Sequence, residues 1–542
     1  MTDPADAGAM VTDGMVTDVL VTDVLVIGGG PAATWAAISA VESGSRVTLV
    51  DKGYCGTSGA TAAGGNNLWL TPPGPRREES IREREGAAGG LTDAEWMRRV
   101  SSTSWDRIEQ LAQWGYPFPV GADGRPMRSS LQGPEYMRRM RRKAHRSGVR
   151  ILDHHPAMEL TTDGDGTVNG ATGIARQDGG RPWRITAGAV VLASGGTAFL
   201  SGTFGTNVNT GDGLLMAAES GADLSGMEFC TAYALAPEWG THTKGRMLQW
   251  GSFYDEHGQP LATRPGLGGR QDAQWALAHG QRVFARLDRA PEHARQTMRD
   301  AQPNYFLPLD KAGIDPFVTA YPVRMVYEGS VRGTGGLRLT EPDCATTVPG
   351  LYAAGDVATR ELVTGSISGG GSHNGSWAIA SGTFAGRGAS EFSLRRAAGP
   401  AAVRERVGIR PGSHDAPTVD EVVRAAQQHV LPPQRSYLKS EKRLVESSAA
   451  LEDLWREIAG GLAPVAARDA YKTRQAVALV AAARWITASS LERKESRGLH
   501  RREDLRGEDH RYGHRILVGG LDEVWTAPDP VLPRLISSEA VA

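Results

Sequence analysis

The chain has 542 residues, and its 60 Lys and Arg nearly balance 61 Asp and Glu, which gives a formal net charge of −1. This length exceeds what one hydrophobic core usually serves, so we expect two or three structural units. Because no long basic stretch interleaves with aromatic residues, a nucleic-acid partner is not expected.

The cysteines and the apolar runs restrict the kind of site and the compartment. Cys55, Cys230 and Cys344 are far apart and form no CxxC pair, which argues against an iron–sulfur cluster or a zinc site, so no metal is expected. A low, odd cysteine count is typical of a reducing compartment. No apolar run approaches the roughly 20 residues that span a bilayer, and the acidic N-terminus is no standard signal peptide. We therefore expect a soluble, cytoplasmic protein without a membrane span.

The first elements form a clear pattern after a tail. Residues 1–20 are expected to be a disordered tail in which Val-Thr-Asp recurs. An apolar strand over 24–27 is followed by three glycines and an Ala-rich helix that reaches about Glu42. A second strand over 47–50 completes a β-α-β unit.

Later segments alternate between loops, strands and helices. We expect a loop over 54–68, polar helices over about 90–150, and a buried strand over 187–193. A helix should open at Asn209 and end at Gly221. The remaining regions are a mixed segment at about 226–320, a return of the nucleotide-domain pattern from Gly335 to about 392, and helical periodicity over 418–493 with Leu444, Leu451 and Leu454 on one face.

The segment Gly28-Gly29-Gly30-Pro31-Ala32-Ala33 fits the G-x-G-x-x-G/A fingerprint of dinucleotide-binding folds. Gly28 permits the tight turn, Gly30 lets a pyrophosphate approach the backbone, and Ala33 lets the helix pack on the sheet. The phosphates would then lie at a helix N-terminus. Asp51, 21 residues beyond Gly30, suits a carboxylate that accepts hydrogen bonds from a ribose.

A second motif some 300 residues downstream favours FAD over NAD. Residues 348–356 (VPGLYAAGD) resemble the second flavin motif of FAD-dependent enzymes, in which a strand ends in Gly-Asp and the carboxylate binds the ribityl chain. NAD has no ribityl chain, so Gly355 and Asp356 indicate FAD.

Four further segments are similar to the fumarate reductase/succinate dehydrogenase flavoprotein family, which includes L-aspartate oxidase and the adenylylsulfate reductase flavoprotein. They are residues 61–67 (TAAGGNN), 210–213 (TGDG), 365–387 (GSISGGGSHNGSWAIASGTFAGR) and 494–500 (KESRGLH). The resemblance covers about residues 22–515 in the family's order. It implies an α/β fold with a split Rossmann-like FAD-binding domain, an inserted α+β capping domain and a helical C-terminal domain.

With these boundaries the resemblance implies FAD-binding parts at 21–225 and 321–395, a capping domain at 226–320 and a helical domain at 415–525. The residues expected to contact FAD come from the motifs above and from the strand that ends near 193. They are Gly28, Gly30, Pro31, Ala32, Ala33, Asp51, Lys52, Thr57, Ser58, Gly59, Ala63, Gly64, Gly65, Ala193, Ser194, Gly195, Asn209, Asp212, Gly355, Asp356, Ser372 and Ser376.

The chain also departs from this family. Members that link FAD covalently use a His where this chain has Ser58, so FAD is expected to be non-covalent. Tyr233 lies about where succinate and fumarate enzymes carry a His. The cap-domain Arg has only the candidates Arg282, Arg286 and Arg289, which helical spacing would put on one helix face, where an exposed, solvated role explains them equally.

Four residues are candidates for catalysis. His373, in the Gly/Ser-rich loop, is the candidate general acid or base, with a structural role in a tight loop as the alternative. Arg497 is expected at the end of a long apolar helix that Gly498 stops, where it contacts substrate or flavin or complements the helix dipole. His500 has the same two interpretations, and Tyr233 is a hydrogen-bond donor or a packing residue. Residues 501–515 are expected to form a solvated surface.

The sequence therefore indicates an FAD-dependent oxidoreductase, an oxidase or dehydrogenase that passes a hydride between a small polar, anionic substrate and the flavin. Two alternatives stay open. The chain is a flavoprotein subunit that docks on an iron–sulfur electron-transfer partner, or it is a flavin-binding scaffold without turnover. The electron acceptor and self-association into a homo-oligomer also stay open.

Overall fold

The computed structural model describes residues 19–121, 124–243, 246–262, 268–370, 372–396 and 412–531. Most of the expected tail lies outside these residues. The expected boundary at residue 20 is wrong, because Val19 and Leu20 already belong to β1 (Val19–Ile27) and pair with Arg184 and Ile185 of β8 (Arg181–Leu192).

The largest sheet has seven strands and contains the predicted β-α-β unit. β1 lies between β2 and β8, and all three are parallel. β15 is parallel to β8, whereas β7 runs antiparallel to the first half of β8 and β6 runs antiparallel to β7. The remaining strands are β2 (Val47–Val50), β5 (Arg150–Leu152), β6 (Ala157–Thr162), β7 (Val168–Ala175) and β15 (Leu351–Ala353).

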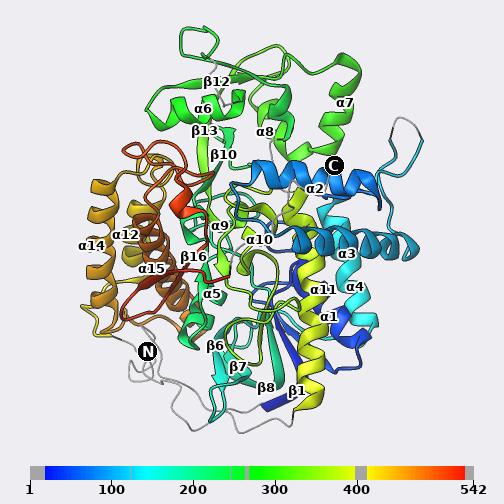
Figure 1. Cartoon of the computed structure of the whole chain (residues 1–542), viewed down its shortest axis with the longest axis vertical. Helices are drawn as coiled ribbons and strands as arrows, with labels where there is room; N and C mark the ends of the chain where they lie inside the picture. The colour runs from blue at the N-terminus through cyan, green and yellow to red at the C-terminus, as the bar shows by residue number, and fades with distance from the viewer. Residues whose placement is uncertain are drawn as a thin grey trace, which may run out of the picture.

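Two helices far apart in sequence pack side by side on this sheet, α1 (Pro31–Glu42) and α11 (Ser372–Arg395) (Figure 1). Glycines on α11 make this approach close. A Cβ at Gly382 would lie 2.4 Å from the carbonyl oxygen of Ala32, and one at Gly386 would lie 2.2 Å from that of Ala36. The contact joins the two parts of the FAD-binding fold, between which the second sheet's segment is inserted in the sequence.

The described residues between β2 and β5 contain three helices. Two of them, α3 (Ala94–Gln113) and α4 (Gly133–Arg146), lie in the expected helical stretch, whereas α2 (Pro75–Ala87) precedes it and was not predicted. The segment 54–68, predicted as a loop, also contains the short strand β3 (Gly65–Asn67), which pairs with β4 (Ser130–Gln132).

A second, antiparallel sheet with its own core lies at the top of Figure 1. Its order is β10 (Ala232–Pro237), β13 (Tyr321–Glu328), β12 (Val283–Arg286) and β11 (Ser252–Tyr254). The helices α6 (Gly269–Ala278), α7 (Glu292–Ala301) and α8 (Pro303–Lys311) accompany it.

The helix expected to carry three arginines of this segment is absent. Arg286 ends the strand β12, Arg282 precedes it, and Arg289 follows it in a turn. The spacing of four and three residues between Arg282, Arg286 and Arg289 therefore did not indicate a helix. Alternating burial along Val283–Arg286 explains the strand instead.

The C-terminal helices α12 (Val419–Val430), α14 (Glu441–Ile458) and α15 (Ala470–Glu492) pack together, and the predicted face of α14 is confirmed because Leu444, Leu451 and Leu454 are buried. A third sheet ties them to the FAD-binding fold. Its order is β14 (Gly336–Leu337), β9 (Leu224–Ser225), β16 (Ile516–Gly519) and β17 (Trp525–Pro528). No helix within the described part of the chain has the length and apolar character needed to cross a bilayer.

Candidate functional site

A cavity of about 1650 Å³ opens where four strands of the largest sheet end. The segments that directly follow β1, β2, β8 and β15 form one wall, namely Gly28–Gly30, Asp51–Gly53, Ala193–Gly195 and Gly355–Asp356. The opposite wall comes from β10, α6 and other parts of the second sheet's segment. Ligands of open α/β sheets bind at such carboxyl ends of the strands.

The glycine-rich turn has the geometry that a bound dinucleotide needs. Gly28 has φ +128°, and a Cβ there would lie 2.2 Å from the carbonyl oxygen of Ala193, so only glycine fits. Gly30 is the N-cap of α1, with Pro31 next, and a Cβ on Gly30 would meet no atom within 4 Å. Open space at the start of a helix is what a pyrophosphate requires.

The two expected carboxylates also lie on the cavity wall. Asp51 accepts a hydrogen bond from the Gly53 amide at 2.7 Å, and burial raises its pKa. Burial also raises the pKa of Asp356, although Arg360 and Arg332 act in the opposite direction. Ser194 Oγ is a buried wall atom with no hydrogen-bond partner within the described part of the chain. These features fit the hydroxyl and phosphate groups of FAD.

Most of the residues expected to contact FAD line this cavity, but five do not. Ala33 is a buried residue of α1, and Ser376 Oγ donates to the Trp69 carbonyl at 3.0 Å. Thr57 lines a separate small cavity instead. Neither Ala63 nor Gly64 reaches the wall. The expected residues that do line the cavity are Gly28, Gly30, Pro31, Ala32, Asp51, Lys52, Ser58, Gly59, Gly65, Ala193, Ser194, Gly195, Asn209, Asp212, Gly355, Asp356 and Ser372.

Two of these wall residues bind each other. Lys52 Nζ lies 2.7 Å from Asp212 Oδ2 and donates to Thr210 Oγ1 at 2.8 Å. The pair links the end of β2 to the start of α5 (Asp212–Glu219). Lys52 and Asp212 therefore stabilise the shape of the cavity wall in this structure.

Comparison with known families matches both ends of the chain. Residues 23–238 match the FAD binding domain family, and residues 428–522 match the fumarate reductase flavoprotein C-terminal family. The chain therefore contains an FAD binding domain and a C-terminal domain of the kind found in fumarate reductase flavoproteins. This flavoprotein is an FAD-dependent oxidoreductase, and FAD is its cofactor.

Relatives are similar over nearly the whole chain. The L-aspartate oxidase of Streptomyces coelicolor is 25% identical over 91% of this chain and 90% of its own length. A fumarate reductase flavoprotein subunit of Mycobacterium tuberculosis is 27% identical over 91% of this chain and 94% of its own length. Among solved structures, a mutant E. coli quinol fumarate reductase has a TM-score of 0.79 at 19% identity, covering 96% of this chain and 98% of that one. The adenylylsulfate reductase of Archaeoglobus fulgidus has 0.77 at 18% identity, covering 99% of both chains.

His373, the expected general acid or base, does not line the cavity of this flavoprotein. Its ring stacks on Trp69 with 4.7 Å between centroids, and its Nδ1 lies 3.2 Å from the Gly369 carbonyl. Burial and the nearby Arg84 lower the pKa of His373 to about 3. A neutral imidazole bonded to its own loop matches the structural alternative.

We therefore expect His373→Gln to leave the pH dependence of kcat/KM unchanged between about pH 5 and pH 8. The imidazole stays neutral across this range and therefore contributes no ionisation to the pH profile. Steady-state rates across that range, with wild type as the reference, provide the measurement. Loss of an ionisation in the variant would restore His373 as an acid or base.

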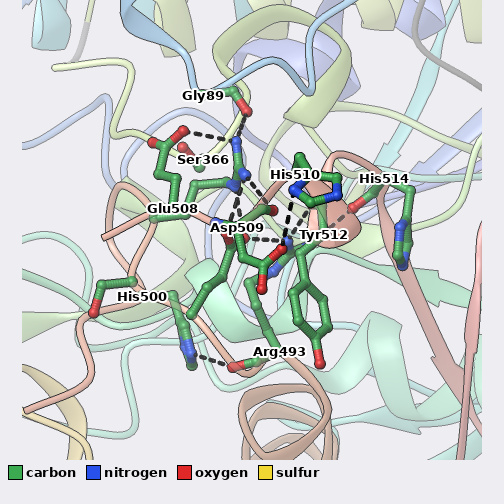
Figure 2. A network of polar contacts seen from close by, with 12 residues as sticks. Gly89, Ser366, Arg493, His500, Glu508, Asp509, His510, Tyr512 and His514 are labelled. Atoms are coloured by element: carbon green, nitrogen blue, oxygen red, sulfur yellow. Dashed lines mark hydrogen bonds and ion pairs between the residues drawn. The ribbon is translucent and has the colours of Figure 1, made fainter. Parts of the chain in front are cut away.

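Arg497 and His500 belong to a buried polar network rather than to the cavity wall (Figure 2). α15 ends at Glu492, so Arg497 does not terminate the helix as expected. Arg497 Nε donates to Glu495 at 2.6 Å, and its Nη1 donates to the Gly89 carbonyl and lies 3.0 Å from Glu508. Arg497 therefore holds the segment after α15 against the turn after α2.

His500 is fully buried, and burial together with nearby cations holds its pKa well below its usual value. Its Nε2 lies 3.0 Å from the Arg493 carbonyl, and its Nδ1 lies 3.1 Å from Lys439 Nζ. Arg493 also binds Glu228 at 2.7 Å, and both side chains are fully buried. Arg497 and His500 of the Lys-Glu-Ser-Arg-Gly-Leu-His motif thus make structural contacts, whereas Gly498 and Leu499 line the cavity.

Tyr233 alone among the four catalytic candidates lines the cavity. Its hydroxyl donates to the Leu431 carbonyl at 2.9 Å, and its ring packs edge-on against Tyr327 at 5.1 Å. Burial raises the pKa of Tyr233 far above its usual value. The hydroxyl is directed to α12's end, which fits the packing interpretation.

Arg289, one of the three candidates for the cap-domain Arg, lines the cavity, and so do four arginines that no motif marked. These four are Arg176, Arg270 of α6, Arg332 at the end of α9 (Gly329–Arg332), and Arg501. The expectation of a solvated surface over 501–515 is wrong at its start, because Arg501 stacks on Tyr437 at 4.6 Å and reaches the cavity wall. One feature of the sequence could have marked Arg332 as a site residue. It lies just before Gly335, where the nucleotide-domain pattern returns.

Arg332 lies beside a buried carboxylate. Its Nε is 3.6 Å from Glu328 Oε1, and Glu328 also accepts from Thr243 Oγ1 at 2.6 Å. Arg270 is accessible from the cavity, and surrounding protein together with Arg332 lowers its pKa. Because the positive charges of Arg270 and Arg332 repel each other, an anion bound between them would be stabilised.

Glu361 is a second fully buried carboxyl group, near Glu228. Burial and the charge of Glu228 raise the pKa of Glu361 to about 7. A carboxyl group whose pKa is higher in the folded protein than in the unfolded chain stabilises the fold only while it is protonated. The free energy of unfolding therefore falls as the pH rises from 4.5, the pKa in the unfolded chain, through about 7. Glu361→Gln should therefore raise the free energy of unfolding at pH 8 by roughly 1–3 kcal/mol and change it little at about pH 4.5.

Thermal unfolding at several pH values measures this effect. Glu79→Gln, the same change at an exposed position of α2, is the matched control. Its effect on Tm should be small and should not depend on pH. An equal shift of the Glu361→Gln variant at low and high pH would contradict the assignment.

Proposed function

We propose that this flavoprotein transfers a hydride between a small anionic substrate and non-covalently bound FAD. One observation carries the proposal. A single cavity combines the dinucleotide cradle with Arg270, Arg289 and Arg332. Guanidinium groups pair with carboxylates and similar anions through two parallel hydrogen bonds, so an anionic substrate would relieve the repulsion between these side chains.

Bound FAD would supply the redox chemistry. The chain's own residues would bind and orient both molecules. The first turn of α1 and Gly30 would accommodate the pyrophosphate, Asp51 the ribose and Asp356 the ribityl chain. Glu328 is our candidate for a general base, because its carboxylate lines the cavity between Thr243 and Arg332.

The chemistry of the wall supports non-covalent attachment. Within the described part of the chain, no His or Cys lines the cavity, and Ser58 does. Acid precipitation of the purified protein should therefore leave the yellow colour in the supernatant. The three cysteines are free and buried, which supports our inference of a cytoplasmic location.

The substrate class is tested by anaerobic titration of the purified flavoprotein with mono- and dicarboxylates, amino acids and sulfite. Bleaching of the flavin absorbance by an anionic member of this panel, and by no uncharged analogue, is the expected result. Bleaching by uncharged compounds alone would reject an anionic substrate. If photoreduction shows an intact flavin but no compound bleaches it, the alternative of a scaffold without turnover gains.

A second candidate function is that of a subunit in an electron-transfer complex. A separate cavity of about 540 Å³ lies on the outer side of the segment 54–62, whose inner side lines the larger cavity. Its rim is basic, with Arg142, His145 and Arg146 of α4, which suits an acidic partner protein. Reoxidation in air after photoreduction separates the two functions, because an oxidase reoxidises rapidly and such a subunit slowly.

A further inference from the structure

We propose that Arg360 is a positioning residue that links the carboxylate of Asp356 to the segment that presents Glu328 and Arg332 to the cavity. The inference rests on the proposed function, because it assumes that Asp356 binds FAD and that Arg332 faces the substrate. It adds a connection between the two binding regions that neither flavin motif contains.

The guanidinium of Arg360 contacts both regions directly. Arg360 lies four residues after Asp356, just before α10 (Glu361–Thr364), and its side chain is fully buried. Its Nη1 donates to Asp356 Oδ1 at 2.5 Å. Its Nη2 donates to the main-chain carbonyls of Ser330 at 2.8 Å, Val331 at 3.3 Å and Gly333.

These carbonyls fix the backbone on both sides of Arg332. They belong to α9 and to the residue after its end, and Glu328 immediately precedes α9. Asp356, Val331, Arg332 and Glu328 all line the cavity, whereas Arg360 lies behind them. The Arg360 side chain therefore connects Asp356, on the proposed flavin side of the cavity, to α9, on the proposed substrate side.

The buried charge of Arg360 needs the carboxylate of Asp356 as its partner. Burial lowers the pKa of Arg360, and Asp356 and the Cys230 thiol counteract that effect, whereas Arg332 adds to it. Within the described residues, Asp356 is the one carboxylate that binds Arg360. Loss of one partner of a buried pair leaves an uncompensated charge, so a change at Arg360 must move Asp356, the α9 backbone or both.

The expected consequence is coupling between cofactor binding and the order of α9. FAD held by Asp356 should restrain Arg360 and, through it, the carbonyls of 330–333. By linkage, a well-ordered α9 should in turn strengthen FAD binding. A residue that merely filled space would not transmit such an effect.

The test uses the full-length apoprotein, with FAD affinity measured by flavin fluorescence and order measured by hydrogen–deuterium exchange. Arg360→Met should weaken FAD binding at least about tenfold, and Arg360→Lys, which keeps the charge, should retain much of it. In an Asp356→Asn background, Arg360→Met should weaken FAD binding less than about twofold further. Saturating FAD should slow exchange over 328–334 in the wild type and in Arg360→Lys but not in Arg360→Met.

Arg484→Met is the matched control, because Arg484 is equally buried and binds Glu452 and the Leu521 carbonyl away from the cavity. It should change stability but not the protection of 328–334 by FAD. If Arg360→Met does not fold, equal FAD affinity and protection in Arg360→Lys and Arg360→Gln would overturn the proposal. Additive effects of Arg360→Met and Asp356→Asn would overturn it too. A wild type that binds no FAD would instead reject the proposed function.

Discussion

Gly30→Glu is expected to abolish FAD binding and leave the fold intact. A Cβ on Gly30 points into open cavity and meets no atom within 4 Å, so the apoprotein accommodates the new side chain. Its carboxylate would then occupy the space of the pyrophosphate at the N-terminus of α1. Because two like charges brought together cost several kcal/mol, we expect FAD affinity to fall at least about 100-fold.

Titration of apoprotein with FAD measures the affinity, and thermal unfolding without FAD measures the fold. Gly86→Glu is the matched control, since Gly86 of α2 is exposed and a Cβ there also meets no atom within 4 Å. This control should bind FAD as the wild type does. Full occupancy of Gly30→Glu with FAD would refute the position that we assign to the pyrophosphate.

Arg332→Met is expected to lower kcat/KM by about 10²–10³-fold and to change FAD affinity far less. Arg332 lines the cavity beside Glu328, and its removal takes away both the cation for the substrate and the partner of a buried carboxylate. Truncation of one partner of a buried charge pair typically costs 2–5 kcal/mol, which is the origin of our range.

The measurement needs the substrate found by anaerobic titration, followed by steady-state kinetics. Arg282→Met is the control, because Arg282 lies at the surface, 3.7 Å from Glu238, and does not line the cavity. Arg332→Lys should recover part of the loss because it keeps the charge. Wild-type kcat/KM in Arg332→Met would exclude Arg332 from substrate binding.

Local pattern was sufficient to predict the cofactor-binding part of this protein. The strand over 24–27, the glycine turn and Asp51 lie within one short β-α-β unit, so their spacing in sequence fixes their spacing in the fold. Gly355-Asp356 was recognisable for a similar reason, because the motif follows directly after a buried strand. The apolar face of α14 depended only on helical periodicity.

Three of the four catalytic candidates lie away from the cavity wall for the opposite reason. His373, Arg497 and His500 stand in motifs, yet packing directs them into a loop contact or a buried network away from the cavity wall. Motif membership indicates that a side chain is needed in the fold, but it does not distinguish a ligand contact from a structural one. Only the surroundings of each side chain decide this.

The sequence by itself determined the cofactor and the two glycine-bearing turns at which we place it, because these depend on short segments. The tertiary structure decided which cations line the cavity. Arg270 lies in α6 and Arg332 in α9, and they share a cavity because the segment with β10–β13 folds over the ends of the large sheet. Contacts between residues so distant in sequence arise from packing, which leaves no periodic or local signal in the chain.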